Sequence, residues 1–336
     1  MGDSDKVRWD LRSLGLSDVI IDAAWPDWWS AAAEASPSAQ AELRFSLSRK
    51  LGLDPRSLLD DEQPRFVWRD EGKFKGLNVD TPVERGALVS FGAAVGRALV
   101  AAASPGPPLV GVAALELRAS ILRKQSYVRL IDLLALCWAV GVPTVHLRIF
   151  PLAAKRFAAM IVRAADRFAI LLARDSQYPA PVAFYLAHEI GHAALGHIGR
   201  DGVLVDFADP LRPVKTDDEE RAADGYALTL LTGMAEPRIL SEATRYSAEA
   251  LAQAILASAD ELHIEPGVMA MCFGHSTSAW DKAQAAMKII YTSPRPVWKE
   301  VNAVAAEQMD WSALPGDMQP YLRALLGEEP NVGSGS

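Results

Sequence analysis

Cysteine is almost missing from this chain of 336 residues, which contains only two. Cys137 and Cys272 stand far apart, and neither belongs to a CxxC pair. This spacing excludes a disulfide framework and argues against a metal site built from cysteine. Scarce cysteine is typical of proteins from a reducing compartment, so we expect the protein to be cytoplasmic.

Long uninterrupted apolar runs are missing as well. The first residues, MGDSDKVRWD, are charged throughout and lack the apolar segment of a secretory signal, so we expect no export. Two apolar stretches, 87–103 and 130–145, are interrupted by Arg97 in the first and by Asp132 and Pro143 in the second. A membrane-spanning helix needs about 20 predominantly apolar residues. We therefore expect two buried helices and no membrane association.

The chain also lacks an excess of positive charge. Its 34 basic residues face 42 acidic ones, which gives a formal net charge of −8. Proteins that are drawn to nucleic acid or anionic lipid by their overall charge carry the opposite sign. Half of the residues are apolar and 23% are charged, which is the composition of an ordinary globular protein.

The N-terminal part of the chain has the pattern of a helical unit. Residues 16–59 carry apolar side chains at helical spacing, with a Ser-Pro-Ser break and a turn-forming Gly52. Charged segments follow at 60–64 and 69–76 and have the composition of a linker. The sequence therefore predicts an all-helical unit over residues 1–75.

The middle of the chain, residues 76–235, combines helical and strand patterns. The predicted helices cover 82–103, 116–140, 181–197 and 217–231, and the predicted strands cover 143–150, 157–164 and 167–173. Short turns between the strands predict a small antiparallel sheet. A loop rich in Asp, Gly and Pro is expected at 200–216. Because residues 236–330 have a helical pattern, we expect a mostly helical α+β fold with a C-terminal helical extension.

A metal-binding signature lies in the third of these predicted helices. The pentapeptide HEIGH at 188–192 matches the pattern H-E-x-x-H. Residues four apart project from the same helix face, so His188 and His192 can bind one cation together. Glu189 is displaced around the helix and can reach a water beside the metal, which makes it the candidate general base. Neutral imidazoles suit zinc, and a catalytic zinc site needs a third protein ligand.

The third ligand has to come from another segment. A pattern with a third histidine six residues after the second is excluded, because Ile198 stands there. His197 is offset by about 140° around the helix from His192, so we assign it to the helix end or to a supporting role. In the next predicted helix, Glu220 and Asp224 share one face. We predict Glu220 as the third ligand and Asp224 as a support that orients a zinc-bound imidazole.

The remaining residues of that helix fit a close approach to the HEIGH helix. Ala223 and Ala227 are small enough to let the two helices come together. Asp217, Asp218 and Glu219 are predicted to form a solvated charge cluster that complements the helix dipole. We therefore expect none of these three to bind the metal.

With these motifs the chain resembles the ImmA/IrrE family of cytoplasmic zinc metallopeptidases. The similarity covers roughly residues 115–235 and is carried by WAVGVPTVHL, YLAHEIGH and EERAADGYALTLL. The resemblance implies a zincin-like fold with His188, His192 and Glu220 as zinc ligands and Glu189 as the catalytic acid and base. The chain departs from the family in lacking the arginine often found just before the HExxH helix.

The resemblance also implies a function. It suggests a regulatory endopeptidase that cleaves a protein such as a repressor or an antitoxin. Apart from the resemblance, the sequence offers Tyr185 and His197 as candidates for stabilising the oxyanion and does not choose between them. Two other functions stay open: a zinc-binding sensor or scaffold without hydrolysis, and a transcription regulator that acts through the N-terminal unit.

The N-terminal unit is itself similar to part of a Cro/repressor-type helix-turn-helix, in the segment SPSAQAELRFSLSRKLGLDPRSLL. Where the recognition helix is expected, the sequence is IIDAAWPDWWSAA. Residues 1–62 contain twelve acidic and seven basic side chains, a poor balance for contacting phosphates. We therefore favour a degenerate or protein-binding unit over a DNA-binding one. For Trp25, Trp28 and Trp29 we favour an aromatic mini-core over a surface for a partner.

Overall fold

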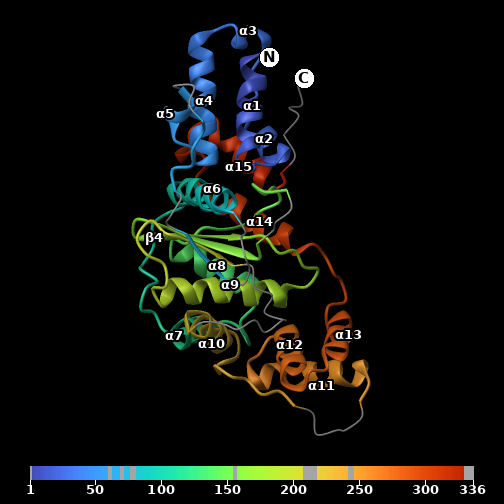
Figure 1. Cartoon of the computed structure of the whole chain (residues 1–336). Coiled ribbons are helices and arrows are strands. Elements are labelled where there is room, and N and C mark those ends of the chain that lie inside the picture. The colour runs from blue at the N-terminus through green and yellow to red at the C-terminus, as the bar shows by residue number, and fades with distance from the viewer. Residues whose placement is uncertain are drawn as a thin grey trace, which may run out of the picture.

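A five-stranded sheet with helices on both faces forms the centre of the computed structural model (Figure 1). The structure describes residues 2–59, 63–68, 72–75, 81–153, 157–206, 218–240 and 246–328. The strands are β1 (Gly72–Lys75), β2 (Thr144–His146), β3 (Ala159–Ala164), β4 (Arg167–Leu172) and β5 (Val203–Asp206). Their order across the sheet is β1-β5-β3-β4-β2.

The sheet is mixed, which corrects the antiparallel sheet that the sequence predicts. β3 pairs antiparallel with β4 and β5, whereas β1 runs parallel to β5 and β2 parallel to β4. The strands predicted at 143–150, 157–164 and 167–173 are confirmed as β2, β3 and β4. β1 and β5 lie in segments that the sequence predicts as linker and loop. Each has four residues and ends in a charged one, which is too short for a recognisable alternation.

The two faces of the sheet contact different helices, because side chains alternate along each strand. From β3, Met160 and Val162 join the core that contains α6. Ala159 and Ile161 join the opposite core, which contains α8 and α9. The helices of this region are α6 (Pro82–Ala101), α7 (Ala114–Leu122), α8 (Leu130–Ala139), α9 (Pro179–Ala194) and α10 (Asp218–Thr232). Of these, α6, α8 and α9 contact the sheet, whereas α10 packs against α9 and α7 on the side away from the strands (Figure 1).

One of the four helical predictions for this region needs correction. The segment 116–140 contains two helices, α7 and α8, in place of one. The carboxylate of Asp132 accepts a hydrogen bond from the backbone amide of Arg129 at 3.0 Å, which caps the start of α8. The other three predicted helices are confirmed as α6, α9 and α10, with ends that differ by a few residues.

The N-terminal residues form short helices, as their sequence predicts. These are α1 (Asp3–Ser13), α2 (Asp18–Ala24), α3 (Ala31–Glu34), α4 (Pro37–Leu51) and α5 (Pro55–Leu59). Ser36 caps α4 through its side chain, and Gly52 ends it with a φ of 70°. Trp25 and Trp29 meet edge to face and pack against the core, as predicted, whereas Trp28 is 43% exposed.

The C-terminal residues are helical and return to the top of the molecule. Their elements are α11 (Ala248–Leu262), α12 (Pro266–Thr277), α13 (Trp280–Ile290), α14 (Val297–Gln308), the 3₁₀ turn η1 (Trp311–Ala313) and α15 (Met318–Leu325). Helices α11 to α13 lie below α9, whereas α15 lies at the base of the N-terminal helices (Figure 1). Asp317 accepts hydrogen bonds from Ser46 at 2.8 Å and Arg49 at 2.6 Å, which ties this end of the chain to α4.

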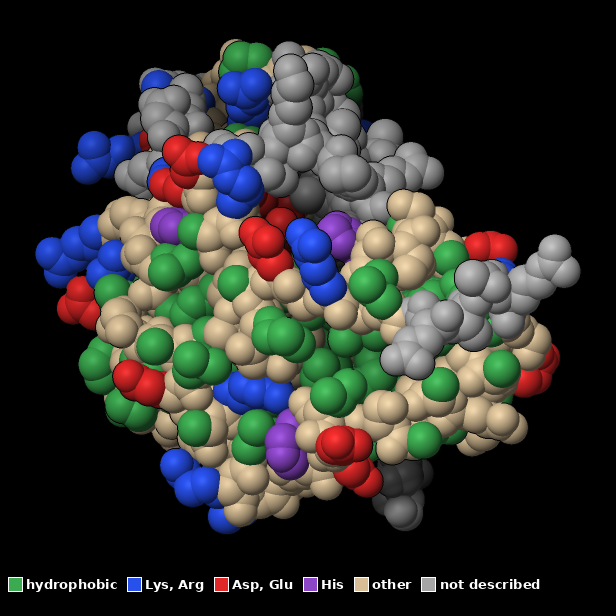
Figure 2. All heavy atoms as spheres, turned by 90° about the horizontal axis from the view of Figure 1, so that it is seen from below, with side chains coloured by type: hydrophobic (Ala, Val, Ile, Leu, Met, Phe, Trp, Pro, Cys, Tyr) green, Lys and Arg blue, Asp and Glu red, His purple; other side chains and the backbone are tan. Residues whose placement is uncertain are grey.

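The lower face, formed by α7 and α10 to α13, shows apolar side chains with acidic and basic ones scattered among them (Figure 2). Among the described residues, every helix is too short or too polar to cross a bilayer. Residues 60–62, 69–71, 76 and 207–216 of the predicted linker and loop segments lie outside the described residues.

Candidate metal centre

Helix α9 carries two histidines and a glutamate into the interior. Pro179 occupies its first turn, and apolar side chains bury most of its length against the sheet. The exposed fractions of His188, Glu189 and His192 are 5%, 0% and 0%. Three polar side chains buried on one helix need partners from other elements, because burying an unpartnered polar group is costly.

Helix α10 supplies a partner because it lies close against α9. Ala223 and Ala227 are fully buried at the contact, as their size predicts. On α9 the facing residue is Gly191, where a Cβ would lie 3.1 Å from the carbonyl oxygen of Ala223. The glycine inside the HEIGH motif therefore permits the close approach that brings Glu220 to the histidines.

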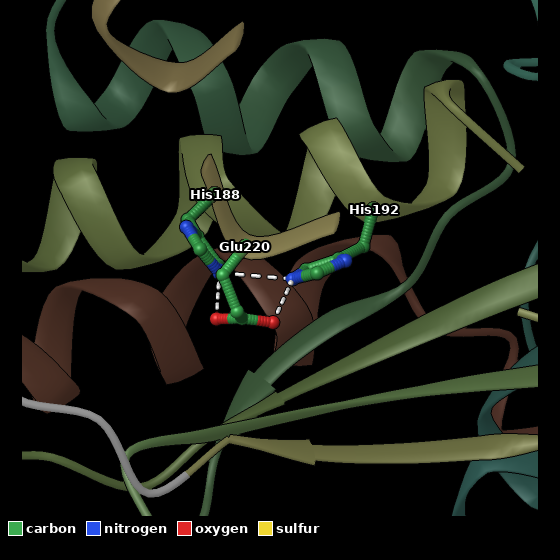
Figure 3. Close-up of side chains that lie close together, drawn as sticks. All are labelled: His188, His192 and Glu220. Atoms are coloured by element: carbon green, nitrogen blue, oxygen red, sulfur yellow. Dashed lines mark hydrogen bonds and ion pairs between the residues drawn. The ribbon is translucent and has the colours of Figure 1, made fainter. Parts of the chain in front are cut away.

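His188, His192 and Glu220 point toward one another from these two helices (Figure 3). The Nε2 atoms of the two histidines are 2.9 Å apart. Glu220 Oε1 lies 3.3 Å from His192 Nε2, and Glu220 Oε2 lies 3.5 Å from His188 Nε2. Two ligand atoms on a tetrahedral zinc, with bonds of roughly 2.0 to 2.1 Å, are about 3.3 Å apart. The three side chains thus have the spacing of a metal-binding triad.

The other ring nitrogen of each histidine has its own partner. Nδ1 of His188 lies 2.9 Å from Asp224 Oδ1, where a carboxylate fixes the tautomer that leaves Nε2 free to bind a metal. This is the contact predicted for Asp224. Nδ1 of His192 lies 2.8 Å from Nδ1 of His197. Because α9 ends at Ala194, His197 stands beyond the helix and supports His192 from there.

The surroundings favour an anionic Glu220. Burial opposes its charge, but contacts with His188 and His192 outweigh burial and lower the pKa of Glu220. For His188, contacts with Asp224 and Glu220 likewise outweigh burial and raise its pKa well above the usual value. Burial lowers the pKa of His192. A metal ion at Nε2 of His188 would displace the proton that this raised pKa favours, and the triad would then offer one carboxylate and two imidazoles, a donor set that suits zinc.

Glu189 shares the interior with the triad but makes no hydrogen bond to it. Neither of its carboxylate oxygens has a hydrogen-bond partner among the described residues. Burial and the nearby charges of Asp206 and Glu220 raise the pKa of Glu189 well above its usual range, although His188 acts in the opposite direction. A buried carboxyl group without a partner costs stability. Such a carboxyl group fits a site that binds a metal ion and a water molecule.

Two charged residues next to the triad come from strands that the sequence analysis missed. Asp206, at the end of β5, is 3% exposed, and its Oδ2 lies 4.0 Å from His188 Nε2. Lys75, at the end of β1, places its Nζ 3.9 Å from Glu220 Oε1. The apolar run VLV before Asp206 is the one sequence signal that favours a buried strand ending at the site.

Glu219 lies in the first turn of α10 with a partly exposed side chain, as predicted, but it also makes ion pairs that the sequence does not predict. Its carboxylate pairs with Lys73 at 2.9 Å and with Lys75 at 3.0 Å, so it joins α10 to β1. Asp218 is exposed and pairs with Arg221 of the same helix, as a solvated residue does. Asp217 lies outside the described residues.

Tyr185, a candidate for stabilising the oxyanion, is buried in the core around α9. The guanidinium of Arg174 lies 5.7 Å from its ring centroid.

Comparisons of the chain with protein-family models, with curated proteins and with solved structures give no match. The geometry of the centre therefore carries the functional argument.

Proposed function

We propose that the chain is a zinc-dependent endopeptidase. The observation that carries this proposal is the placement of Glu189, a fully buried carboxyl group without a hydrogen-bond partner among the described residues, beside a triad with metal-binding spacing. A structural metal site needs donors alone, whereas a hydrolytic one also needs a base.

Each residue has a distinct task in this mechanism. His188, His192 and Glu220 would hold the ion, which when bound would supply an electrophile that polarises the scissile carbonyl and makes water more acidic. Glu189 would accept a proton from the attacking water and deliver it to the leaving amine nitrogen. Asp224 and His197 would keep the two imidazole rings in place.

We further propose that the substrate is a protein, such as a repressor or an antitoxin, on the basis of the resemblance to ImmA/IrrE peptidases. The N-terminal unit then serves protein contacts rather than DNA binding. The basic residues of α4 support this view, because they face inward or pair with acids. Arg44 pairs with Asp3, and Lys50 donates a hydrogen bond to the carbonyl of Ala24 at 2.9 Å.

A second candidate function is a zinc-binding sensor or scaffold that does not hydrolyse peptides. The observation in its favour is the burial of the triad, whose residues are between 0% and 6% exposed. A structural metal site is closed, whereas a catalytic one keeps a position open for water and substrate.

Metal analysis and proteolysis of the Glu189→Gln variant separate the two candidates. The purified wild-type protein should contain about one zinc per chain, cleave casein or a repressor protein, and lose this activity on chelation. Glu189→Gln should retain zinc and lose activity by roughly 10² to 10⁴-fold, because the amide cannot accept the proton. Glu249→Gln, an exposed change of the same kind on α11, is the matched control.

Cleavage and zinc content together separate the endopeptidase from the sensor or scaffold. Normal cleavage by Glu189→Gln would show that the proposed base is wrong. Stoichiometric zinc in a wild-type protein that cleaves neither casein nor any partner found in cells would favour the sensor or scaffold. A wild-type protein that binds no zinc after reconstitution would remove both candidates.

A further inference from the structure

The end of strand β5 aims a carboxylate at the metal-binding triad. Along β5, Val203 and Val205 join the core on the α6 side, and Leu204 joins the core on the α9 side. Because side chains alternate along a strand, Asp206 projects to the α9 side, where the triad lies. Its contact with His188 agrees with this direction.

The backbone of Asp206 is held from both sides, so the position of its carboxylate is fixed by the sheet. Its Cα pairs with Lys75 of β1 and with Ala159 of β3. Its carbonyl oxygen accepts a hydrogen bond from the amide of Ala158 at 2.7 Å. A side chain at such a paired strand end has little freedom to turn away from the site.

Asp206 lies near the same nitrogen atom that faces the other donors. Its Oδ2 is 4.0 Å from His188 Nε2, and Glu220 Oε2 is 3.5 Å from that nitrogen. A second, independent feature of this interior is Glu189, which is fully buried and has two oxygens without a partner among the described residues. Buried carboxylates that gather around imidazoles are stable when they coordinate or neutralise a cation.

We propose that Asp206 is a fourth residue directed at the metal ion. The three donors of the triad would bind the ion, and Asp206 would balance its second positive charge and hold it on the side of the sheet. The carboxylates of Glu220 and Asp206, which both lie near His188 Nε2, would then face the positive charge of a divalent cation, while Asp224 stays on the Nδ1 side of the His188 ring. This inference rests on the metal site of the proposed function, but it is separate from the proteolytic role of Glu189.

Zinc titration of the metal-free protein tests this role without relying on activity. Asp206→Asn keeps the size of the side chain and removes its charge, so it should weaken zinc binding by roughly 10 to 100-fold. Asp201→Asn is the matched control, because Asp201 stands shortly before the same strand and pairs with Arg97 at 3.0 Å. This control should bind zinc as the wild type does. Circular dichroism should confirm the fold of each variant.

The zinc affinities of the two variants decide whether Asp206 acts on the metal ion. Wild-type affinity in Asp206→Asn would overturn the inference and leave the proposed metal site intact. Equal weakening by both variants would also overturn it, because the effect would then come from the general field of the protein. A wild-type protein without zinc affinity would overturn both proposals. If Asp206→Asn does not fold, Asp206→Ser decides the question in the same titration.

Discussion

The two halves of the candidate metal centre are built from different kinds of structure. Helices α9 and α10 supply the triad, whereas strands β1 and β5 each supply one charged residue near it, Lys75 and Asp206. On the helices, the spacing of His188 and His192 sets their separation directly. On the strands, Lys75 and Asp206 come together through the pairing of two segments that are far apart in the sequence.

From this difference we infer which residues bind the metal ion and which only adjust its affinity. The helix residues approach one another to within ligand spacing, between 2.9 Å and 3.5 Å. The strand residues lie further away: Lys75 Nζ is 3.9 Å from Glu220 Oε1, and Asp206 Oδ2 is 4.0 Å from His188 Nε2. Removing one of the three triad side chains should therefore abolish tight metal binding, whereas changing the contacts of the strands should only weaken it.

The largest expected effect comes from Glu220→Ala. The change removes the carboxylate of the triad and leaves two histidines to hold the ion, so tight zinc binding should be lost. Isothermal titration of zinc into the metal-free variant and the wild type would measure this loss. Tight binding retained by Glu220→Ala would break the comparison, since the helices would then not supply the whole triad.

Asp224→Ala should have a smaller effect, because Asp224 contacts an imidazole and not the ion. Without this carboxylate, Nδ1 of His188 loses its partner at 2.9 Å, and the ring becomes free to turn. The expected penalty is roughly 10 to 100-fold in zinc affinity. In the same titration, a loss as complete as that of Glu220→Ala would contradict the different roles of the two residues.

The sequence allowed the helical half of the site to be predicted because helical periodicity is a local signal. The H-E-x-x-H spacing places two side chains on one face wherever the helix packs. Glu220 and Asp224 follow from the same rule, once a third ligand is required. The structure brings all of these residues together.

The strand half could not be predicted in the same way. A four-residue strand shows hardly two periods of alternation, and GKFK has the composition of a charged linker. The parallel register that places Lys75 beside Asp206 depends on pairing across more than a hundred residues, which no local pattern encodes. The ion pairs of Glu219 could not be predicted for the same reason, because its partners are on β1.

Two glycine variants, one on α9 and one on α10, test how closely these helices pack, and their expected effects are smaller. A methyl group added at Gly191 would lie 3.1 Å from the Ala223 carbonyl oxygen of α10, whereas one added at Gly225 would have its nearest neighbour at 3.8 Å. Alanine favours a helix over glycine by up to about 1 kcal/mol. Gly225→Ala should therefore raise the free energy of unfolding by up to that amount.

Gly191→Ala should not show this gain, because its methyl group pushes against α10. Its free energy of unfolding should stay at or below that of the wild type, and zinc affinity should fall by less than about tenfold as Glu220 shifts. Denaturant unfolding and zinc titration would measure the two effects. Equal stabilisation by both alanines would show that the helices are not closely packed at the motif.

The smallest expected effect concerns Glu219, which links the two halves of the site. Its carboxylate pairs with Lys73 and Lys75, and the Lys75 ammonium is also 3.9 Å from Glu220 Oε1. In Glu219→Ala, Lys75 loses its nearest acid and should pair more closely with Glu220, where it competes with the metal ion. Because Glu219 is partly exposed, the interaction is screened, and we expect a loss of about twofold to fivefold in zinc affinity.

Asp218→Ala is the control for this last prediction, because it removes the same charge from the same turn of α10. The side chain of Asp218 is 92% exposed and pairs with Arg221, away from β1. Its removal should leave zinc affinity unchanged, and added salt should reduce the difference between the two variants. Equal weakening by both would mean that the first turn of α10 acts only through its overall charge. A loss confined to Glu219→Ala would show that strand β1 tunes zinc affinity through the two lysines that pair with Glu219.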